Sequence, residues 1–389
     1  MDLAFSKEDN DFREEVRTWM TENAPRERRP RDLVAMREFD LAWQRKQFAA
    51  GWAGIGWPEQ FGGRELPLTQ QLIWYEEYAR TSLPPIDARF VGLAHAGPTL
   101  MVRATPEHQA FHLPKILAGE VVWCQGFSEP EAGSDLASLK TKAIVDGDHL
   151  VVTGQKIWTS FGPVADYQEL LVRTDFDVPK HKGITWVICD MKSPGIEARA
   201  IKTIEGGQEF AEVFYDEVRI PISNVVGGIN NGWSVAMSTL SFERGTAFTV
   251  SQVQLSTSVE RLIEMAKSRT SVNGRPVIED EALAKKLARA RADVAALRSL
   301  TYLNISRNAR ADQPGPEGSM LKLQDADLTK RVYKLALEVL GTRSLANPHE
   351  EDDSYWVDRH LLSYSSSIGG GTSEIQRNII AERVLGLPR

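Results

Sequence analysis

The sequence predicts an α+β protein with several domains, in which a helical segment is followed by a β segment and then by a second helical segment. From residue 5 to about residue 120, apolar residues recur at spacings of three and four, the period of a helix with one buried face. Between about residues 121 and 221 the period changes to two, as in half-buried strands. From Gly232 onward, helical periods return. We therefore expect an N-terminal α-helical domain over residues 1–120, a middle β domain over 121–231 and a C-terminal helical domain over 232–389.

The middle segment contains a clear signal for paired strands. Asp146 and Gly147 lie between two alternating runs over residues 143–152, which is typical of a tight hairpin. The same alternation continues in further runs, with Gly and Pro between them, over residues 169–174, 184–191, 196–204 and 211–220. Short strands separated by turns predict a small antiparallel barrel or sandwich.

The C-terminal segment contains long helical periods over residues 251–265, 280–308 and 326–340. Polar loops over residues 270–276 and 311–318 separate them. Helices of this length, joined by loops, predict a helical bundle.

The composition sets limits on the kind of protein. The chain is 42% hydrophobic and 25% charged, which is typical of a soluble globular protein. Its 389 residues are too many for a single hydrophobic core, so two or three domains are expected. The net charge of -7 argues against broad nucleic-acid binding. We expect no membrane span, and the acidic N-terminus does not resemble a signal or transit peptide. With only Cys124 and Cys189, a disulfide framework is excluded, and a cytoplasmic location is expected.

Metal binding is not expected from the histidine pattern. His108 and His112 lie one helical turn apart, but no nearby Cys or carboxylate completes a set of three or four ligands.

Three glycines, Gly369 to Gly371, lead directly into Thr372-Ser373-Glu374-Ile375-Gln376-Arg377. Ser373 and Gln376 have the spacing of a capping box, which predicts a helix that begins at Thr372 or Ser373. Free N–H groups and the positive end of the helix dipole favour a phosphate there, and glycines allow a ligand to approach the backbone. Taken alone, the pattern also fits an ordinary capped helix after a flexible linker.

Two further motifs combine donors with a flat aromatic ring. Residues 126–135 contain two serines and two glycines, so their N–H and O–H groups could surround a heterocycle and its phosphate. Lys156-Ile157-Trp158-Thr159-Ser160 follows a strand and offers an indole beside two hydroxyls. A turn-rich linker and a core tryptophan are the alternatives.

With these three motifs in this order, the sequence resembles the acyl-CoA dehydrogenase family of flavoenzymes from about residue 5 to residue 389. The resemblance implies an N-terminal helical domain, a middle antiparallel β-barrel and a C-terminal four-helix bundle. It also implies FAD as cofactor, with part of the FAD held by a neighbouring subunit. In the first two motifs, the residues implied to contact FAD are Gln125, Phe127, Ser128, Gly133, Ser134, Trp158, Thr159 and Ser160.

In the helical segment, the cofactor residues that the resemblance implies are Arg269, Glu338, Gly341, Thr342, Thr372 and Glu374. Three positions depart from the family pattern. Ser160 stands where members often have threonine, Thr270 begins a loop without the usual phenylalanine-glycine pair, and Glu338 stands where glutamine is usual. An ionised carboxylate cannot donate a hydrogen bond, which weakens the assignment of Glu338.

The reaction that the resemblance implies is α,β-desaturation of an acyl-CoA thioester, in which a carboxylate takes the α-proton and the β-hydride moves to flavin N5. Many members place the catalytic glutamate at the position of Gly370, which has no side chain. Isovaleryl-CoA and long-chain acyl-CoA dehydrogenases place it on the first long helix of the bundle, before an arginine, and Glu243 followed by Arg244 matches that position. A surface glutamate paired with a basic neighbour is the ordinary alternative. Ser134, Ser241 and Arg244 are implied to contact substrate, and the N–H of Gly370 to polarise the thioester carbonyl.

Three functions remain open at this point. The first is an acyl-CoA dehydrogenase of fatty acid, branched or steroid side-chain β-oxidation, a homotetramer or dimer of dimers that passes electrons to an electron-transfer flavoprotein. The second is a non-catalytic or half-site subunit of a heteromeric acyl-CoA dehydrogenase. The third is a related flavin oxidase or monooxygenase.

Overall fold

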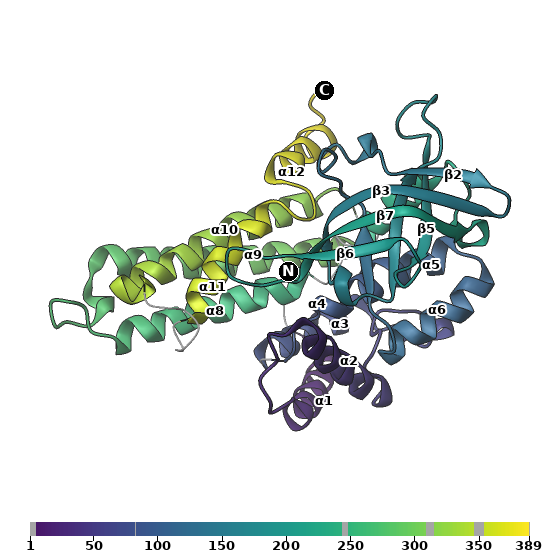
Figure 1. Cartoon of the computed structure of the whole chain (residues 1–389). Helices are drawn as coiled ribbons and strands as arrows, with labels where there is room; N and C mark the ends of the chain where they lie inside the picture. Colours follow the sequence, from purple (N-terminus) through teal and green to yellow (C-terminus); the bar gives the residue numbers. More distant parts are fainter. Residues whose placement is uncertain (1–4, 82, 243–247, 309–314, 346–353, 389) are drawn as a thin grey trace. The chain divides into compact units, whose positions relative to one another are not determined.

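The computed structural model describes residues 5–81, 83–242, 248–308, 315–345 and 354–388. Within this part, the chain forms two compact units that each gather segments distant in the sequence. Unit 1 takes the described residues of Met1–Ala24, Leu68–Leu83 and Arg244–Arg389, and unit 2 those of Pro25–Pro67 and Pro84–Glu243. Figure 1 shows the course of the chain, coloured along the sequence. The helices predicted before residue 120 are therefore divided between the two units.

Unit 1 is helical, as the apolar spacing predicts. Its helices are α1 (Lys7–Asn23), α3 (Leu68–Arg80), α8 (Phe248–Ser268), α9 (Glu281–Asn308), α10 (Gly318–Leu340), α11 (Ser354–Ser363) and α12 (Ser373–Ile379). The three long helical periods predicted near the C-terminus correspond to α8, α9 and α10, which run side by side with α11 in Figure 1. Their apolar faces share one core that includes Val259, Leu287 and Val332. Burial of this stripe, more than intrinsic helix propensity, stabilises such helices.

Unit 2 contains an eight-stranded sheet in the middle segment, as predicted. Its strands are β1 (Trp123–Gly126), β2 (Lys142–Asp146), β3 (His149–Ser160), β4 (Tyr167–Arg173), β5 (Ile184–Asp190), β6 (Ile196–Ile201), β7 (Phe210–Pro221) and β8 (Val225–Val226). The predicted hairpin is confirmed, because Asp146 pairs with His149 across the turn and Gly147 has φ +60°. A positive φ at this position is the reason for glycine.

The sheet is mostly antiparallel, but β4 pairs in parallel with both β1 and β2. Parallel neighbours need a crossover connection, and residues 127–141 and the β2–β3 hairpin lie between β1 and β4 in the chain. Alternation of apolar residues reports which face of a strand is buried and carries no information on strand direction. The sequence pattern therefore predicted the strands but not these two parallel pairings.

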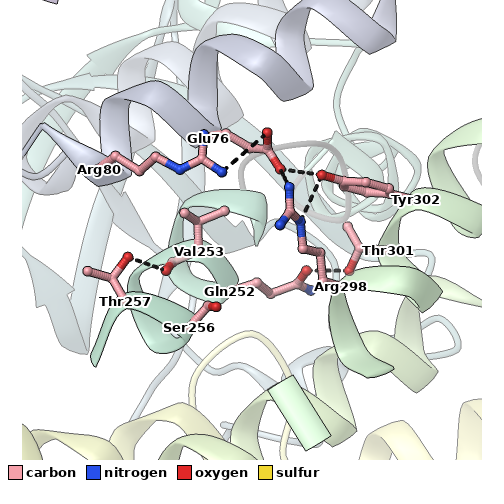
Figure 2. Close-up of a pocket in the computed structure, with 9 residues that line it drawn as sticks. All are labelled: Glu76, Arg80, Gln252, Val253, Ser256, Thr257, Arg298, Thr301 and Tyr302. Atoms are coloured by element: carbon pink, nitrogen blue, oxygen red, sulfur yellow. Dashed lines mark hydrogen bonds and ion pairs between the residues drawn. The ribbon is translucent and has the colours of Figure 1, made fainter. Parts of the chain in front are cut away.

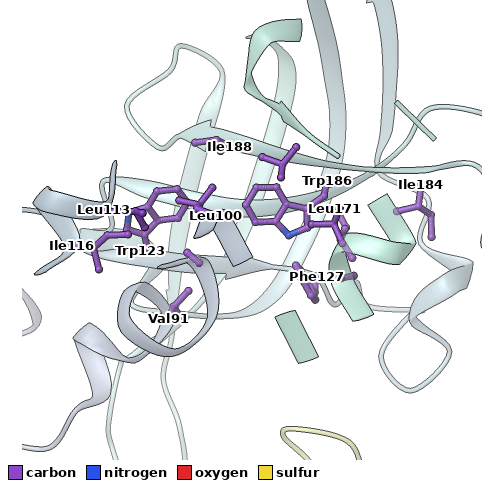
Figure 3. Close-up of a cluster of buried hydrophobic side chains, with 14 of the residues drawn as sticks. Val91, Leu100, Leu113, Ile116, Trp123, Phe127, Leu171, Ile184, Trp186 and Ile188 are labelled. Carbon is purple, nitrogen blue, oxygen red and sulfur yellow. The ribbon is translucent and has the colours of Figure 1, made fainter. Parts of the chain in front are cut away.

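Helices cover one face of the sheet of unit 2. They are α2 (Leu33–Ala49), α4 (Asp87–Phe90), α5 (Gly97–Arg103), α6 (Pro106–Ala118) and α7 (Gly232–Phe242), with a π-helical turn at Val91–Ala96 between α4 and α5. Figure 3 shows the core at this face, where Trp123 and Trp186 lie among aliphatic side chains of α6 and the strands. Both indoles are almost completely buried. Strands β4 and β5 are buried at nearly every position, because both of their faces are covered.

Helix α7 approaches β5 closely at its first residue. A Cβ on Gly232 would lie 2.3 Å from the backbone nitrogen of Trp186, so glycine is required there.

Among the helices that the structure describes, none combines the length and apolar composition needed to cross a membrane.

Candidate functional site

In unit 2, a hydrogen bond joins the loop after β1 to the C-terminal half of β3. The N–H of Ile157 donates to the carbonyl of Ser128 at 3.0 Å. The two motifs that the sequence singled out around residues 126–135 and 156–160 therefore lie side by side. They form one surface whose parts are held in a fixed register.

A buried ion pair holds the loop after β1 in place. The Lys156 ammonium is completely buried and donates to the Glu129 carboxylate at 2.8 Å and to the Phe127 carbonyl at 3.1 Å. The backbone N–H groups of Lys140 and Thr141 donate to the same carboxylate at 2.6 and 2.9 Å. These four hydrogen bonds together hold the start of the loop against β3.

The pKa values of the pair follow from this environment. Burial lowers the pKa of Lys156 to about 8, although the Glu129 carboxylate counteracts it. Burial opposes ionisation of Glu129, but Lys156 and the N–H donors outweigh it and hold the pKa of that carboxyl below its ordinary value. Both groups are therefore charged at neutral pH.

Trp158 lies on an irregular part of β3. The pairing of β3 with β7 shifts register between Lys156 and Thr159, which is a β-bulge. Within it, Trp158 has φ +61°, a conformation that costs energy for a bulky residue, and its indole is 56% exposed beside Phe210. A large aromatic ring held in a strained backbone and turned outward is typical of a binding surface. The alternative of a core tryptophan is wrong.

The other predicted residues of these two motifs differ in exposure. Gly133 and Ser134 are exposed, and no heavy atom lies within 4 Å of where a Cβ on Gly133 would be. Ser128 and Ser160 are half-buried. Phe127 and Thr159 have buried side chains, so any contact they make with a ligand must come from their backbone atoms.

Gln125 belongs to a buried polar cluster that the sequence did not predict. Its side-chain nitrogen donates to the Glu169 carboxylate at 2.8 Å and lies 3.2 Å from Nδ1 of His95. His95 is carried by the π-helical turn at Val91–Ala96, a kind of turn that is frequent at functional sites. Because the amide is engaged here, Gln125 contributes to the site by fixing the strand that leads into the loop.

In unit 1, the glycine run leads into α12 as predicted. Gly370 and Gly371 have φ of +68° and +88°, and Thr372 is the N-cap of a helix that begins at Ser373. The predicted capping box between Ser373 and Gln376 is wrong. The Thr372 hydroxyl accepts from the N–H of Ile375, which is the residue at the third helical position, and the Gln376 side chain reaches back to the glycines.

Gln376 fixes the orientation of the glycine peptides. Its side-chain nitrogen donates to the carbonyls of Gly370 and Gly371 at 2.9 and 3.3 Å. A Cβ on Gly371 would lie 2.7 Å from that nitrogen, so the glycine permits the contact. The N–H of Gly370 has no acceptor among the described residues, which leaves it available for a ligand.

We expect Gln376→Leu to weaken binding of the FAD that the resemblance implies by about tenfold, because two hydrogen bonds that orient the glycine loop are lost. Titration of the apoprotein with FAD, followed by flavin fluorescence, measures the effect. Asn378→Leu, on the exposed side of the same helix, is the control and should leave affinity unchanged. Equal affinity of Gln376→Leu and the wild type would show that the loop needs no such support.

The remaining predicted cofactor residues of unit 1 lie at helix ends. Arg269 is half-buried directly after α8, and its carbonyl accepts from Val277, which closes the loop between α8 and α9. Gly341 ends α10 with φ +59°, and Thr342 is exposed after it. The Glu338 carboxylate pairs with Lys286 at 2.6 Å. Glu374 is exposed and pairs with Arg377 at 3.3 Å.

Two predicted residues, Glu243 and Arg244, lie outside the described residues. The structure describes α7 up to Phe242 and α8 from Phe248. Ser241 lies at the end of α7, where its hydroxyl donates to the carbonyl of Ser238 at 2.7 Å. The predicted catalytic base therefore stays a prediction.

Each unit, taken by itself, contains residues that suit a flavin dinucleotide. Unit 2 presents an exposed indole, two serine hydroxyls and an open position at Gly133. In unit 1, the buried hydroxyl oxygen of Ser373 has no hydrogen-bond partner among the described residues. A flat ring to stack on, donors for a phosphate and glycines that allow close approach are the features that such a cofactor requires.

The described residues contain no group of three or more His, Cys, Asp or Glu that could hold a metal ion. His112 is buried and packs edge-on against Trp123 and Tyr167. Burial lowers its pKa to about 4, so the ring is neutral at neutral pH. Its surroundings are those of a core histidine.

Sequence reasoning missed Glu129, Lys156 and Gln376 as supports of the site. Lys156 occupies the same face of β3 as the buried residues Val152 and Leu150, so alternation could have marked it as a buried lysine. Its partner is 27 residues distant in sequence, and no local pattern identifies it.

Family models for the three domains of acyl-CoA dehydrogenases match the chain in order. The N-terminal domain matches residues 6–120, the middle domain residues 124–218 and the C-terminal domain residues 230–385. The acyl-CoA dehydrogenase IpdE1 of Mycobacterium tuberculosis is 38% identical over 387 residues, which cover 97% of this chain and 98% of that protein. FadE26 of the same organism, also an acyl-CoA dehydrogenase, is 32% identical over 403 residues, covering 100% and 99%.

Two solved structures are similar over the whole chain. The Tcur3481-Tcur3483 steroid ACAD has a TM-score of 0.88 at 30% identity and covers 100% of both chains. The ChsE4-ChsE5 complex from Mycobacterium tuberculosis has a TM-score of 0.86 at 30% identity and also covers 100% of both chains.

Proposed function

Because the chain belongs to the acyl-CoA dehydrogenase family, whose members are FAD-dependent oxidoreductases, we propose that it forms the α,β double bond of an acyl-CoA thioester. The observation that carries this proposal is the match of all three domain models in order along one chain. The local geometry supports it, because the exposed indole of Trp158 and the tightly held loop after β1 suit a flavin.

The proton chemistry falls to two groups of the chain. The Glu243 carboxylate takes the α-proton, and the N–H of Gly370 donates to the thioester carbonyl oxygen, which gains negative charge as the proton leaves. The Gly370 N–H is suited to this role because it has no acceptor among the described residues. When bound, FAD supplies the acceptor for the β-hydride. Ser134, Ser241 and Arg244 would contact the substrate.

For the cofactor, we propose contacts from both units. In unit 2, the side chains of Trp158, Ser128, Ser134 and Ser160 and the backbone of Phe127, Gly133 and Thr159 would face the flavin and pyrophosphate. In unit 1, Arg269, Gly341, Thr342, Thr372 and Glu374 would contact the pyrophosphate and adenosine. Glu338 is the weakest addition to the unit 1 residues, since Lys286 already pairs with its carboxylate.

The substrate class that we propose is a steroid-derived or branched acyl-CoA. A steroid ACAD is among the structures similar over the full chain, and glycine at position 370 leaves room for a bulky acyl group. We also propose an electron-transfer flavoprotein as acceptor, a homotetramer or dimer of dimers as assembly, and domains that end at residues 120 and 231.

A panel of acyl-CoA substrates tests the proposal. Short, branched, long and steroid-derived acyl-CoAs are mixed with the FAD-loaded protein without oxygen, and bleaching of the flavin is recorded. We expect bleaching to be fastest with the branched or steroid-derived compounds. If no acyl-CoA bleaches the flavin, the proposed activity is wrong, and if only short straight chains do, the substrate class is wrong.

A second candidate is a subunit of a heteromeric acyl-CoA dehydrogenase that depends on a partner for its base. The similarity to the ChsE4-ChsE5 complex and the lack of an acid at Gly370 favour it. The chain purified alone decides between the two. Stoichiometric FAD with turnover supports the lead proposal, whereas little FAD and no turnover, both restored by a partner chain, supports the second.

A further inference from the structure

Unit 1 contains a small polar cavity between α3, α8 and α9, and none of the residues assigned to the cofactor or substrate is among those that line it. Its volume is about 60 Å³, which is room for about four waters. Figure 2 shows the residues that line it, which are Glu76, Arg80, Gln252, Val253, Ser256, Thr257, Arg298, Thr301 and Tyr302. Nearly all of them are polar, so the cavity is suited to a polar occupant.

The acceptor groups in its wall are already engaged. One oxygen of the buried Glu76 carboxylate accepts from Arg298 at 2.6 Å and from the Tyr302 hydroxyl, and the other accepts from Arg13 at 2.9 Å. Burial and the Glu76 carboxylate raise the pKa of Tyr302 to about 12, so its hydroxyl keeps its proton at neutral pH. The Thr301 hydroxyl donates to the side-chain oxygen of Gln252.

The donor groups are in excess. Gln252 is 6% exposed, and its side-chain nitrogen has no acceptor among the described residues. The Thr301 hydroxyl bonds the oxygen of the same amide, so the nitrogen is the amide atom that has no partner. The cavity therefore contains a buried donor that lacks an acceptor, and such a group costs free energy.

Charge is also in excess on the positive side. Four arginines contact the two glutamates of α3: Arg13 reaches both Glu76 and Glu77, Arg298 reaches Glu76, and Arg17 and Arg80 reach Glu77. Arg17 is also paired with Glu14. This described network therefore contains four arginines and three glutamates, Glu14, Glu76 and Glu77. The excess of positive charge favours an anion in the cavity.

We propose that this cavity is a binding site for a carboxylate anion. The Gln252 amide nitrogen donates to one of its oxygens, and the guanidinium groups of Arg80 and Arg298 balance its charge. Both arginine side chains are about two-fifths exposed, at 40% and 42%, so an anion in solvent can reach them. A cation is disfavoured by the same charges, and an uncharged acceptor leaves the excess positive charge without a partner.

Binding of acetate to the FAD-loaded protein tests the proposal. We expect saturable binding of carbon-13-labelled acetate with a dissociation constant of roughly 1–10 mM, measured by NMR line broadening against chloride at equal ionic strength. Gln252→Met, which keeps the length of the side chain but removes its donor, should weaken binding by about tenfold or more. Ser256→Ala, a milder change in the same wall, should weaken it less.

The control is Gln254→Met, the same change two residues further along α8 at a position that does not line the cavity. Its affinity for acetate should equal that of the wild type. The absence of saturable binding in the wild type overturns the proposal, and so does equal affinity in Gln252→Met and Gln254→Met. Ser256→Ala supplies the same comparison if Gln252→Met does not fold.

The carboxylate could come from a free metabolite or from the far end of an acyl-CoA substrate, and a second arm distinguishes these sources. This arm alone rests on the proposed function. An acyl-CoA with a terminal carboxylate is compared with its methyl ester in the wild type and in Gln252→Met. A substrate source predicts that the variant raises KM for the carboxylate compound alone, whereas a free source predicts equal effects on both compounds. The acetate measurement does not depend on turnover, so it decides the binding site even if dehydrogenase activity is absent.

Discussion

Glu243→Gln is expected to give a folded, yellow protein that has lost nearly all dehydrogenase activity. Glutamine keeps the size of the side chain but cannot accept the α-proton, and removal of a general base typically costs about 10²- to 10⁴-fold in rate. Gly370 has no side chain that could replace it. The measurement is turnover of the best acyl-CoA of the panel, together with the FAD content of each preparation.

A matched change on α8 provides the control. Glu260→Gln alters an exposed glutamate that pairs with Arg291 at 2.7 Å, and it should leave turnover unchanged. FAD content equal to that of the wild type in Glu243→Gln would show that the loss lies in proton removal and not in cofactor binding. Turnover close to that of the wild type would assign the base to another residue.

The fold could be predicted to a large extent because burial imposes a period on the sequence. The strands over residues 143–152 and 211–220 and the helices α8, α9 and α10 each bury one face or a stripe, and this periodicity is local. Which segments pack together is not local. In unit 1, α3 joins the C-terminal helices through contacts such as the Arg298–Glu76 pair, which spans 222 residues, and α1 joins α3 through the Arg13–Glu76 pair, which spans 63.

The candidate site also contains some features that could be predicted from the sequence and others that could not. The glycine run and the loop after β1 could be identified from short motifs, because turns and helix starts have local signatures, whereas the exposure of Trp158 is seen only in the structure. The supports of these motifs could not, since a side chain such as Gln376 has several possible partners and only packing selects one. Gln376 has the spacing of a capping box with Ser373, yet it donates to the carbonyls of Gly370 and Gly371.

Lys156→Met should cause the largest loss of stability among these changes, because it leaves the Glu129 carboxylate buried without its cation. Breaking a buried ion pair by removal of one partner costs about 3–5 kcal/mol, and the Phe127 carbonyl loses its donor as well. The loop after β1 would no longer be held against β3, so we also expect weaker binding of FAD. Denaturant unfolding and FAD titration measure the two effects.

Lys140→Met is the matched control, because the Lys140 ammonium pairs with the exposed Glu131 at 2.6 Å and should contribute little. The pH dependence tests the cause. The pKa of Glu129 is lowered in the folded protein, so its contribution is fully present above the ordinary value of 4.5 and is lost as the pH falls through the folded pKa. Lys156→Met lacks this contribution, so the stability difference from the wild type should narrow as the pH falls below about 4.5. A difference that stays constant down to this range would assign the loss to packing around the lysine side chain instead of to its charge.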